Sequence, residues 1–557
     1  MTRIHKKLRY TALAVACIMA TVQFAFSQSY LAQPKVNQTV SFNNTRLNNE
    51  SVKFKQILFL LANAYVDTLD VGKVSEDAMI HLMQQLDPHS VYISAKDVKE
   101  MEEPLLGKFE GIGIEYAIIR DTLTVQSVIP GGPSEKVGLR AGDKINSVDG
   151  EVISGTKLTQ MRVLKYLRGD KGTKVRVGVI RRGEKERELV ITRDKIPLNT
   201  VSSAYEIRPG IMYIRVSSFG AQTYNEFMTP LEGKVIKGLI IDLRGNGGGY
   251  LHTALRLVNE FMEKGQLILF SEGRAVERTD DYADGTGKLQ NVQVAVLIDE
   301  NSASASEILS GAIQDWDRGI LIGRRSFGKG LVQQEFPLQD GSRVRITVAR
   351  YHTPSGRVIQ SPYKMGQADE YYRKFYERYL TGESFNADSI KINDSLKFKT
   401  LKLGRTVYGG GGIMPDVYIP MDTSYYSKSF LAAVNKGILS DFVGIYADSH
   451  RKEFERKYGT FSASQSEEIN DRVYSNFVDN FEVSDKYLKE FLDYAKQNKI
   501  EFTEEELQRS GEKLKDYLKG LIVRNLYGLD YYIRYDNLTD DEVRFAIDSL
   551  ESPDNLE

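Results

Sequence analysis

The sequence predicts an α/β core with helical regions on both sides, because strand patterns and helix patterns alternate in its middle part. Residues 235–262 have the pattern of a buried strand, a glycine-rich turn and a helix. Residues 290–333 begin with an apolar run typical of a buried strand, continue at helical spacing, and reach a second short apolar run. Residues 51–95 and 425–557 instead carry apolar residues at helical spacing among charged ones, which indicates helices.

Length and composition indicate the class of protein. A chain of 557 residues is long enough for three or four domains and a large core. The 74 basic and 75 acidic residues leave a net charge of −1, so the overall balance gives no reason to expect a nucleic-acid partner. The composition is that of an ordinary soluble globular protein.

The first 27 residues differ from the rest of the chain. Basic residues precede an apolar run over 10–26 that ends at Ser27, which is the pattern of a secretory signal peptide. An uncleaved membrane anchor is the alternative, since the run is close to the shortest length that spans a bilayer. A lipoprotein signal at Cys17, the single cysteine, is disfavoured because the apolar run continues well past it. We expect an exported protein, periplasmic or membrane-associated on the outer side of the cytoplasmic membrane.

The next segments connect this signal to the core. Residues 28–50 are rich in Asn, Gln, Ser and Thr, which is typical of a linker. Residues 51–95 form the predicted N-terminal helical region, whose second helix, at about 75–86, stops at Asp87-Pro88.

Residues 96–195 contain GIGI at 111–114, a long glycine-punctuated stretch at 125–151, and MRVLKYL at the start of 161–181. In this order the three segments resemble a PDZ domain, the alternative being a generic small β domain. Glycines at the first segment would let backbone N–H groups face a peptide's terminal carboxylate, and the following strand would accept an extended peptide by strand addition. The predicted peptide-binding residues are Gly111, Ile112, Gly113, Ile114, Met161 and Leu164.

Several serines follow the predicted strand over 292–298, where it turns into a helix. Free N–H groups at a helix start can stabilise an anion, and a lysine with a lowered pKa can activate a serine. Lys329 lies between two glycines on the following element, and burial there would lower its pKa. The alternative is a capping serine run and a solvated loop lysine. Spacing alone does not choose among Ser302, Ser304 and Ser306.

The segments SASASEI, GAIQDWDRG and FGKGLVQ resemble the catalytic core of the carboxyl-terminal processing peptidases, also called tail-specific proteases. The resemblance implies a ClpP/crotonase-like sheet with helices over 196–424, interrupted by a motif-free insertion at 361–404 that we expect to run over the surface. It also implies a serine–lysine dyad of Ser304 and Lys329, with Gln333 supporting the lysine.

The glycine-rich turn at 245–249 could cradle a phosphate or donate N–H groups to an oxyanion. It lacks the GxxxxGK[ST] pattern, and the resemblance favours an oxyanion hole of Gly248 or Gly249 with the N–H of Ala305. The family usually has proline where this sequence has Gly247, which leaves open which N–H points at the substrate.

The sequence therefore predicts a secreted serine endopeptidase that recognises apolar protein C-termini through a PDZ domain and needs no metal or organic cofactor. The alternative is a noncatalytic PDZ scaffold or chaperone on the same fold, against which the intact dyad argues. A Ser–His–Asp protease would require His89, His252 or His352 near a serine, and we interpret His89 as a turn residue. Glu307 and Asp315 are expected to have structural or supporting roles. The C-terminal helical region, 425–557, is expected to cap the core, with homo-oligomerisation or adaptor docking left open.

Overall fold

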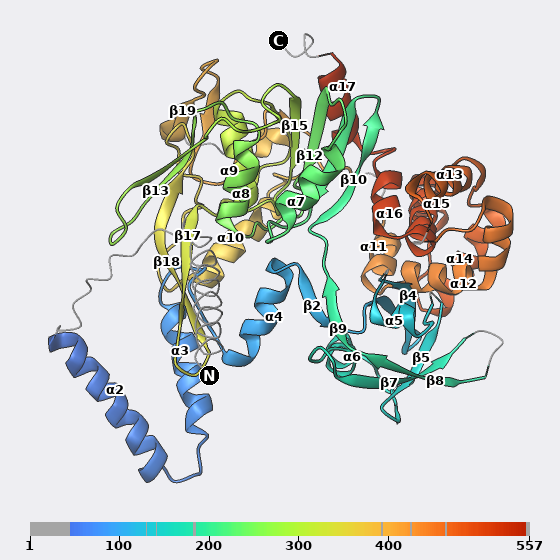
Figure 1. The fold of residues 1–557 in the computed structure, drawn as a ribbon, viewed down its shortest axis with the longest axis horizontal. Coiled ribbons are helices and arrows are strands. Elements are labelled where there is room, and N and C mark those ends of the chain that lie inside the picture. The colour runs from blue at the N-terminus through green and yellow to red at the C-terminus, as the bar shows by residue number, and fades with distance from the viewer. Residues whose placement is uncertain are drawn as a thin grey trace, which may run out of the picture.

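The computed structural model of the chain describes residues 45–552, apart from 130, 141, 182–184, 391–393, 424–425 and 463–464 (Figure 1). The predicted signal peptide and residues 28–44 of the predicted linker lie outside the described residues, whereas residues 45–50 of that linker are helical. Within the described part, no single helix is both long and apolar enough to cross a bilayer. One pair of helices, Lys428–Asn435 and Ile438–Tyr458, meets that criterion only when both are counted across a 67° bend.

A six-stranded sheet in the order β10-β11-β12-β15-β16-β21 forms the centre of the protein. The strands from β11 to β21 run parallel, whereas β10 pairs antiparallel with β11. The helices between the parallel strands provide the crossovers that such a sheet requires. The strands are β10 (Val201–Arg208), β11 (Ile211–Val216), β12 (Gly238–Asp242), β15 (Gln293–Ile298), β16 (Ile320–Gly323) and β21 (Val417–Tyr418). The helices between them are α7 (Thr223–Met228), η1 (Thr229–Leu231), α8 (Leu251–Asn259) and α9 (Ala305–Asp315).

Both faces of this sheet are covered, because alternate side chains of a strand point to opposite faces. Met212 and Ile214 of β11 pack in an apolar cluster with α7, α8 and α9. Ile211 and Tyr213 of the same strand pack instead against α17 (Asp541–Glu551), which lies beside the sheet in Figure 1. The region predicted as a C-terminal cap therefore includes the helix that covers the second face of the core sheet.

An antiparallel sheet in the order β1-β18-β13-β14, with β17 also pairing with β18, adjoins the core. Its strands are β1 (Val91–Ile93), β13 (Leu267–Glu272), β14 (Thr279–Tyr282), β17 (Leu331–Pro337) and β18 (Arg343–His352). Strand β1 pairs with β18, which also pairs with β17, the strand that follows Lys329. The segment that ends the N-terminal helical region therefore belongs to the same sheet as that strand.

The N-terminal region contains α2 (Thr45–Ala64), α3 (Val71–Gln84) and α4 (Ala95–Leu105). Helix α2 projects from the body (Figure 1). Large apolar side chains on it, such as Phe54 and Phe59, are exposed. Helix α3 starts four residues before the predicted 75, because the Asp70 side chain accepts the Lys73 N–H and caps the helix there.

The predicted PDZ domain is a sheet in the order β3-β4-β5-β7-β8, with β6 on β5, so β3 is an edge strand. A two-stranded ribbon, β2 (Lys108–Gly111) with β9 (Asp194–Pro197), joins it to the core. Its elements are β3 (Ile114–Ile119), β4 (Thr122–Val128), α5 (Pro133–Lys136), β5 (Lys144–Val148), β6 (Glu151–Val152), α6 (Gln160–Leu167), β7 (Lys174–Ile180) and β8 (Arg187–Thr192).

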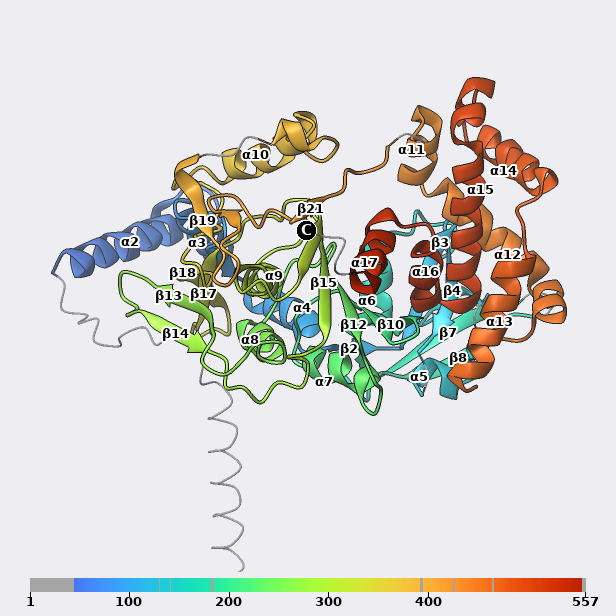
Figure 2. The ribbon, with the colours of Figure 1, turned by 90° about the horizontal axis from the view of Figure 1, so that it is seen from above.

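The helices α11 to α16, which we call the helical unit (residues 428–536), form an aromatic-rich cluster at one end of the molecule (Figure 2). They are α11 (Lys428–Asn435), α12 (Ile438–Tyr458), α13 (Glu467–Asn480), α14 (Asp485–Gln497), α15 (Glu504–Tyr527) and α16 (Leu529–Asp536). The predicted PDZ domain lies against this unit. A Cβ atom added at Gly444 of α12 would come within 2.7 Å of the Ile119 side chain, and the Arg120 guanidinium lies 5.5 Å from the Tyr494 ring centroid.

The insertion contains α10 (Ala368–Leu380), η2 (Ala387–Ser389), η3 (Asp394–Leu396) and β19 (Lys397–Lys399), which pairs with β20 (Thr406–Tyr408). It is not a mere surface excursion. Tyr371 of α10 is buried, and Arg378 donates to the backbone carbonyls of Arg325 and Ser326 at 2.7 and 2.9 Å. Helix α10 therefore supports the loop that precedes Lys329.

Candidate active site

Ser304 is the N-cap residue of α9, at the point where the chain leaves β15 and turns into the helix. Its φ of 56° and ψ of −111° are rare for a residue with a side chain. Such strained conformations persist only where the surroundings enforce them, and they concentrate at functional sites. The backbone thus singles out Ser304 from Ser302 and Ser306, which are buried and donate to the carbonyls of Leu243 and Asn246.

The carboxylate of Glu307 joins the serine turn to the lysine loop. Its Oε2 accepts the backbone N–H groups of Ser304 and Lys329, both at 2.8 Å, and its Oε1 accepts Gly328 N–H and Ser326 Oγ–H at 2.7 and 2.5 Å. Burial raises the pKa of Glu307, and these four hydrogen bonds oppose that rise. A fully buried carboxylate with four donors fixes the spacing of the two loops.

Lys329 lies on the loop between β16 and β17 and has a lowered pKa. Burial is the main cause, and the positive charge of Arg345 adds to it. The Tyr351 hydroxyl lies 2.8 Å from the Lys329 backbone carbonyl and 3.3 Å from that of Ser304, and it donates to the former. Among the described residues, no hydrogen bond joins Ser304 Oγ to Lys329 Nζ.

In the part of the chain that the structure describes, no hydrogen bond joins Gln333 to the Lys329 side chain. Gln333 Nε2 donates to the backbone carbonyl of His89 instead. The His89 N–H donates to Asp87 at 3.0 Å, as in a turn, but its ring packs against Tyr371 and Phe327, at centroid distances of 5.4 and 6.5 Å. Burial, aided by the charge of Lys329, lowers the pKa of His89 to about 4, so the ring is neutral beside the lysine. The local sequence carries no signal for this proximity.

The glycine turn lies against the start of α9. A Cβ atom added at Gly248 would come within 2.8 Å of Ser304 Cβ and 3.0 Å of Ala305 N. The Gly248 N–H donates to Asn246 Oδ1 at 2.8 Å, whereas Gly249 N–H and Ala305 N–H have no hydrogen-bond partner among the described residues. Of the two glycines that the sequence leaves open, Gly249 therefore offers the unengaged donor.

The other two candidate histidines, His252 and His352, each stack on an aromatic ring. His352 stacks on Phe270 at 4.3 Å and His252 on Tyr250 at 5.2 Å. Within the described chain neither histidine forms a hydrogen bond with a serine, so the geometry gives a Ser–His–Asp arrangement no support. Asp315, expected to be supporting, forms a fully buried ion pair with Arg357 at 2.8 Å.

The predicted peptide-binding residues lie on the GIGI loop, on edge strand β3 and on α6. The N–H groups of Ile112 and Gly113 have no hydrogen-bond partner in the described part of the chain, as a carboxylate-binding loop would require. Leu164 lies one helical turn after Gln160, whose side chain accepts the Tyr116 hydroxyl of β3 at 2.7 Å. Leu164 therefore shares the side of α6 that faces β3, while Met161 is 81% exposed.

No group of three or more His, Cys, Asp or Glu side chains among the described residues is arranged to hold a metal ion.

Three family descriptions match this chain. Peptidase family S41 matches residues 210–364, a PDZ domain matches 111–192, and a family of unknown function matches 430–528. The first two cover the candidate active site and the predicted PDZ domain, and the third covers most of the helical unit.

Curated relatives and a solved structure that are similar to this chain are named as C-terminal processing proteases. The carboxy-terminal-processing protease of Bartonella bacilliformis is 34% identical over 333 residues, which cover 58% of this chain and 76% of that protein. The carboxy-terminal processing protease CtpB of Bacillus subtilis is 36% identical over 314 residues, which cover 55% and 65%. The solved photosystem II D1 C-terminal processing protease is 25% identical, with coverage of 67% and 93% and a TM-score of 0.33.

Proposed function

Since the chain belongs to the carboxy-terminal processing proteases of peptidase family S41 and is therefore a serine-type peptidase, we propose that Ser304 and Lys329 form its catalytic dyad. The observation that carries this proposal is the Glu307 Oε2 atom, which accepts the backbone N–H groups of both residues. The lowered pKa of Lys329 supports it, because a neutral amine can accept the serine proton.

In this mechanism, Lys329 Nζ accepts the Ser304 hydroxyl proton as Oγ attacks the scissile carbonyl carbon. The oxyanion is held by the N–H groups of Gly249 and Ala305. Collapse breaks the peptide C–N bond, and the Lys329 ammonium gives its proton to the leaving amine. Water then attacks the acyl-enzyme with Lys329 again as base. The first step requires a hydrogen bond between Nζ and Oγ, so the lysine side chain must reorient from the arrangement described here.

We further propose that the PDZ domain presents protein C-termini to this site. The domain type supports a peptide partner, and the unengaged N–H groups of Ile112 and Gly113 offer donors to a terminal carboxylate. Exposed Met161 and Leu164 favour apolar C-terminal residues. Amidating the C-terminus of a binding peptide should abolish its affinity for the protein, and unchanged binding of the amide would refute this recognition.

Export is also part of the proposal. The basic and apolar start of the sequence supports a signal peptide ending at Ser27 and a location outside the cytoplasmic membrane. N-terminal sequencing of the mature protein from a cell fraction tests both points. A chain that retains residues 1–27 in the membrane fraction would instead indicate an uncleaved anchor.

The dyad is tested by cleavage of an unstructured protein with an apolar C-terminus, using the parent chain, Ser304→Ala and Lys329→Ala. We expect the parent to cleave and both variants to be inactive while their circular dichroism and thermal unfolding remain those of a folded protein. Cleavage by Ser304→Ala would refute the serine assignment. A parent that binds the peptide but never cleaves it would favour the scaffold alternative.

A further inference from the structure

Two arginines directly precede the two loops that carry proposed catalytic groups. Arg244 follows β12 and precedes the glycine turn at 245–249, whereas Arg324 follows β16 and precedes the lysine loop at 325–330. Strand β15 separates β12 from β16 in the core sheet. Direct strand pairing therefore does not set the spacing between the glycine turn and the lysine loop.

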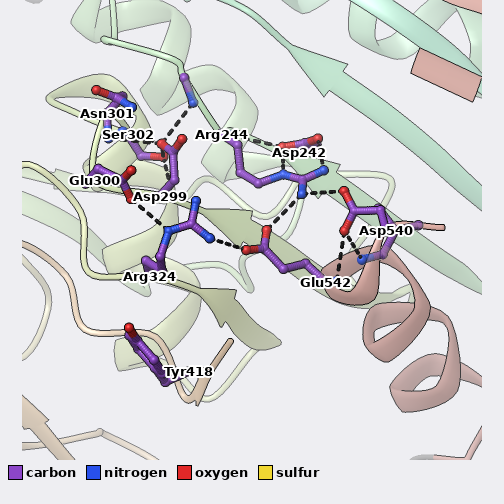
Figure 3. A network of polar contacts seen from close by, with 12 residues as sticks. Asp242, Arg244, Asp299, Glu300, Asn301, Ser302, Arg324, Tyr418, Asp540 and Glu542 are labelled. Atoms are coloured by element: carbon purple, nitrogen blue, oxygen red, sulfur yellow. Dashed lines mark hydrogen bonds and ion pairs between the residues drawn. The ribbon is translucent and has the colours of Figure 1, made fainter. Parts of the chain in front are cut away.

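Glu542 bridges the two arginines (Figure 3). Its Oε2 accepts Arg244 Nη1 at 2.8 Å, and its Oε1 accepts Arg324 Nη1 at 2.5 Å. The carboxylate is thus shared between a residue of each loop. Glu542 is 5% exposed, so water competes little for these bonds.

The other contacts of the two arginines hold them in place. Arg244 donates through Nε and Nη2 to Asp242, at 2.9 and 2.7 Å, and through Nη1 to Asp540 at 2.6 Å. Arg324 donates through Nε to Glu300 at 2.8 Å. Removing one partner from such a buried set would leave a charge without its counter-charge. The charged side chains of the set therefore depend on one another for their positions.

Glu542 is supplied by α17, which also has contacts outside the two loops. Asp540 caps this helix by accepting the N–H groups of Glu542 and Val543, at 2.8 and 3.1 Å. Val543 and Leu550 pack on the core sheet. Just before α17, the Asn537 amide donates to the Tyr205 hydroxyl of β10 at 2.9 Å. These contacts hold the first turn of α17, and with it Glu542, against the core sheet.

We propose that Glu542 is a positioning residue for peptide hydrolysis, which sets the glycine turn against the lysine loop by holding Arg244 and Arg324 together. It acts through the arginines and does not touch substrate. Because α17 directly follows the helical unit, that unit is tied to the geometry of the catalytic loops as well as to the PDZ domain. The inference rests on the proposed dyad, since it concerns the loops that carry the dyad lysine and Gly249, one of the two proposed oxyanion donors.

The test compares steady-state peptide hydrolysis by the full chain with that of Glu542→Gln, Ser304→Ala and a matched control, Asp541→Asn. Asp541 neighbours Glu542 on α17 but is exposed and forms a local ion pair with Arg544. For Glu542→Gln we expect kcat to fall on the order of tenfold with KM within twofold of the parent, because misplaced groups affect the reacting geometry more than ground-state binding. The inflection of the kcat/KM pH profile should not move, because the lysine base is unchanged.

Each outcome has a distinct meaning. If Ser304→Ala still cleaves, the dyad proposal fails. If Ser304→Ala is inactive but folded Glu542→Gln keeps the parent kcat, the positioning role fails while the dyad stands. An equal loss in Asp541→Asn would also overturn it. If Glu542→Gln does not fold, Arg324→Lys tests the same link from the other end, and a folded Arg324→Lys with the parent kcat refutes the inference.

Discussion

The backbone N–H groups of Ser304 and Lys329 donate to one atom, Oε2 of Glu307, at equal distances of 2.8 Å. Twenty-five residues separate the two donors in sequence, yet a single carboxylate oxygen sets the spacing of their backbones. The shared Glu307 oxygen therefore fixes the backbones of the two residues proposed as the dyad, while no Oγ–Nζ hydrogen bond joins their side chains in the described structure.

Replacing this carboxylate should disrupt catalysis more than folding. In Glu307→Gln, an NH₂ group takes the place of one acceptor oxygen and faces N–H or O–H donors. We expect kcat/KM to fall on the order of a hundredfold, and the free energy of unfolding to fall by about 1–3 kcal/mol.

A matched control for this substitution is Glu260→Gln. Glu260 is also buried and accepts the Tyr224 hydroxyl and the Lys288 N–H, at 2.5 and 2.8 Å. It should lose comparable stability in urea unfolding but keep the parent kcat/KM. Equal activity losses in the two variants would show that Glu307 contributes only to folding.

The charge of Arg345 should set the pH at which the enzyme works. Because burial and Arg345 lower the pKa of Lys329 below 10.5, kcat/KM should rise with pH as the neutral amine forms. In Arg345→Met the lysine pKa rises, so the profile should shift to higher pH and activity at neutral pH should fall.

Arg343→Met is the control for that shift. Arg343 lies on the same strand and pairs with the same Glu335, at 2.9 Å, but is not among the charges that act on Lys329. Its pH profile should match that of the parent. A profile unmoved by Arg345→Met would exclude Lys329 as the titrating base.

A methyl group at Gly248 should block the site. Gly248 has a φ of 102°, and the added Cβ would lie 2.8 Å from both Ser304 Cβ and the Ala303 carbonyl oxygen. We expect Gly248→Ala to lose activity beyond detection in a fluorogenic peptide assay, because the turn must move away from Ser304.

Gly245→Ala separates backbone strain from this collision. Gly245 belongs to the same turn and has a φ of 73°, but its added Cβ would meet nothing within 4 Å. Gly245→Ala should lower the free energy of unfolding by about 1–2 kcal/mol, because a residue with a side chain disfavours the left-handed conformation. It should keep most of the activity. Similar inactivation of both variants would mean that strain alone explains the loss at Gly248.

The sequence carried enough information for the fold class and for the PDZ and S41 segments, because each depends on local periodicity and on motifs with fixed spacing. It could not show that Gln333 reaches the His89 carbonyl or that His89 lies beside Lys329, since more than 230 residues separate these partners. Charge pairs such as Glu542 with Arg324 have no local signature either, because any exposed acidic residue of a helix looks the same in sequence. The insertion at 361–404 likewise carries no motif in its sequence, because its role depends on distant partners. Arg378 donates hydrogen bonds to two backbone carbonyls of the lysine loop.

The position of α17 has a consequence for biosynthesis. Strands β10 to β16 are all synthesised by residue 323, but the apolar face formed by Ile211, Tyr213 and Ile240 stays uncovered until residues 541–551 have been made. An emerging chain therefore cannot complete its core sheet, or fasten the two loops through Glu542, until more than 200 further residues have left the ribosome. Proteolytic competence is thereby deferred until α17 has been made, and a chain that stops before residue 541 leaves this apolar face of the core sheet exposed.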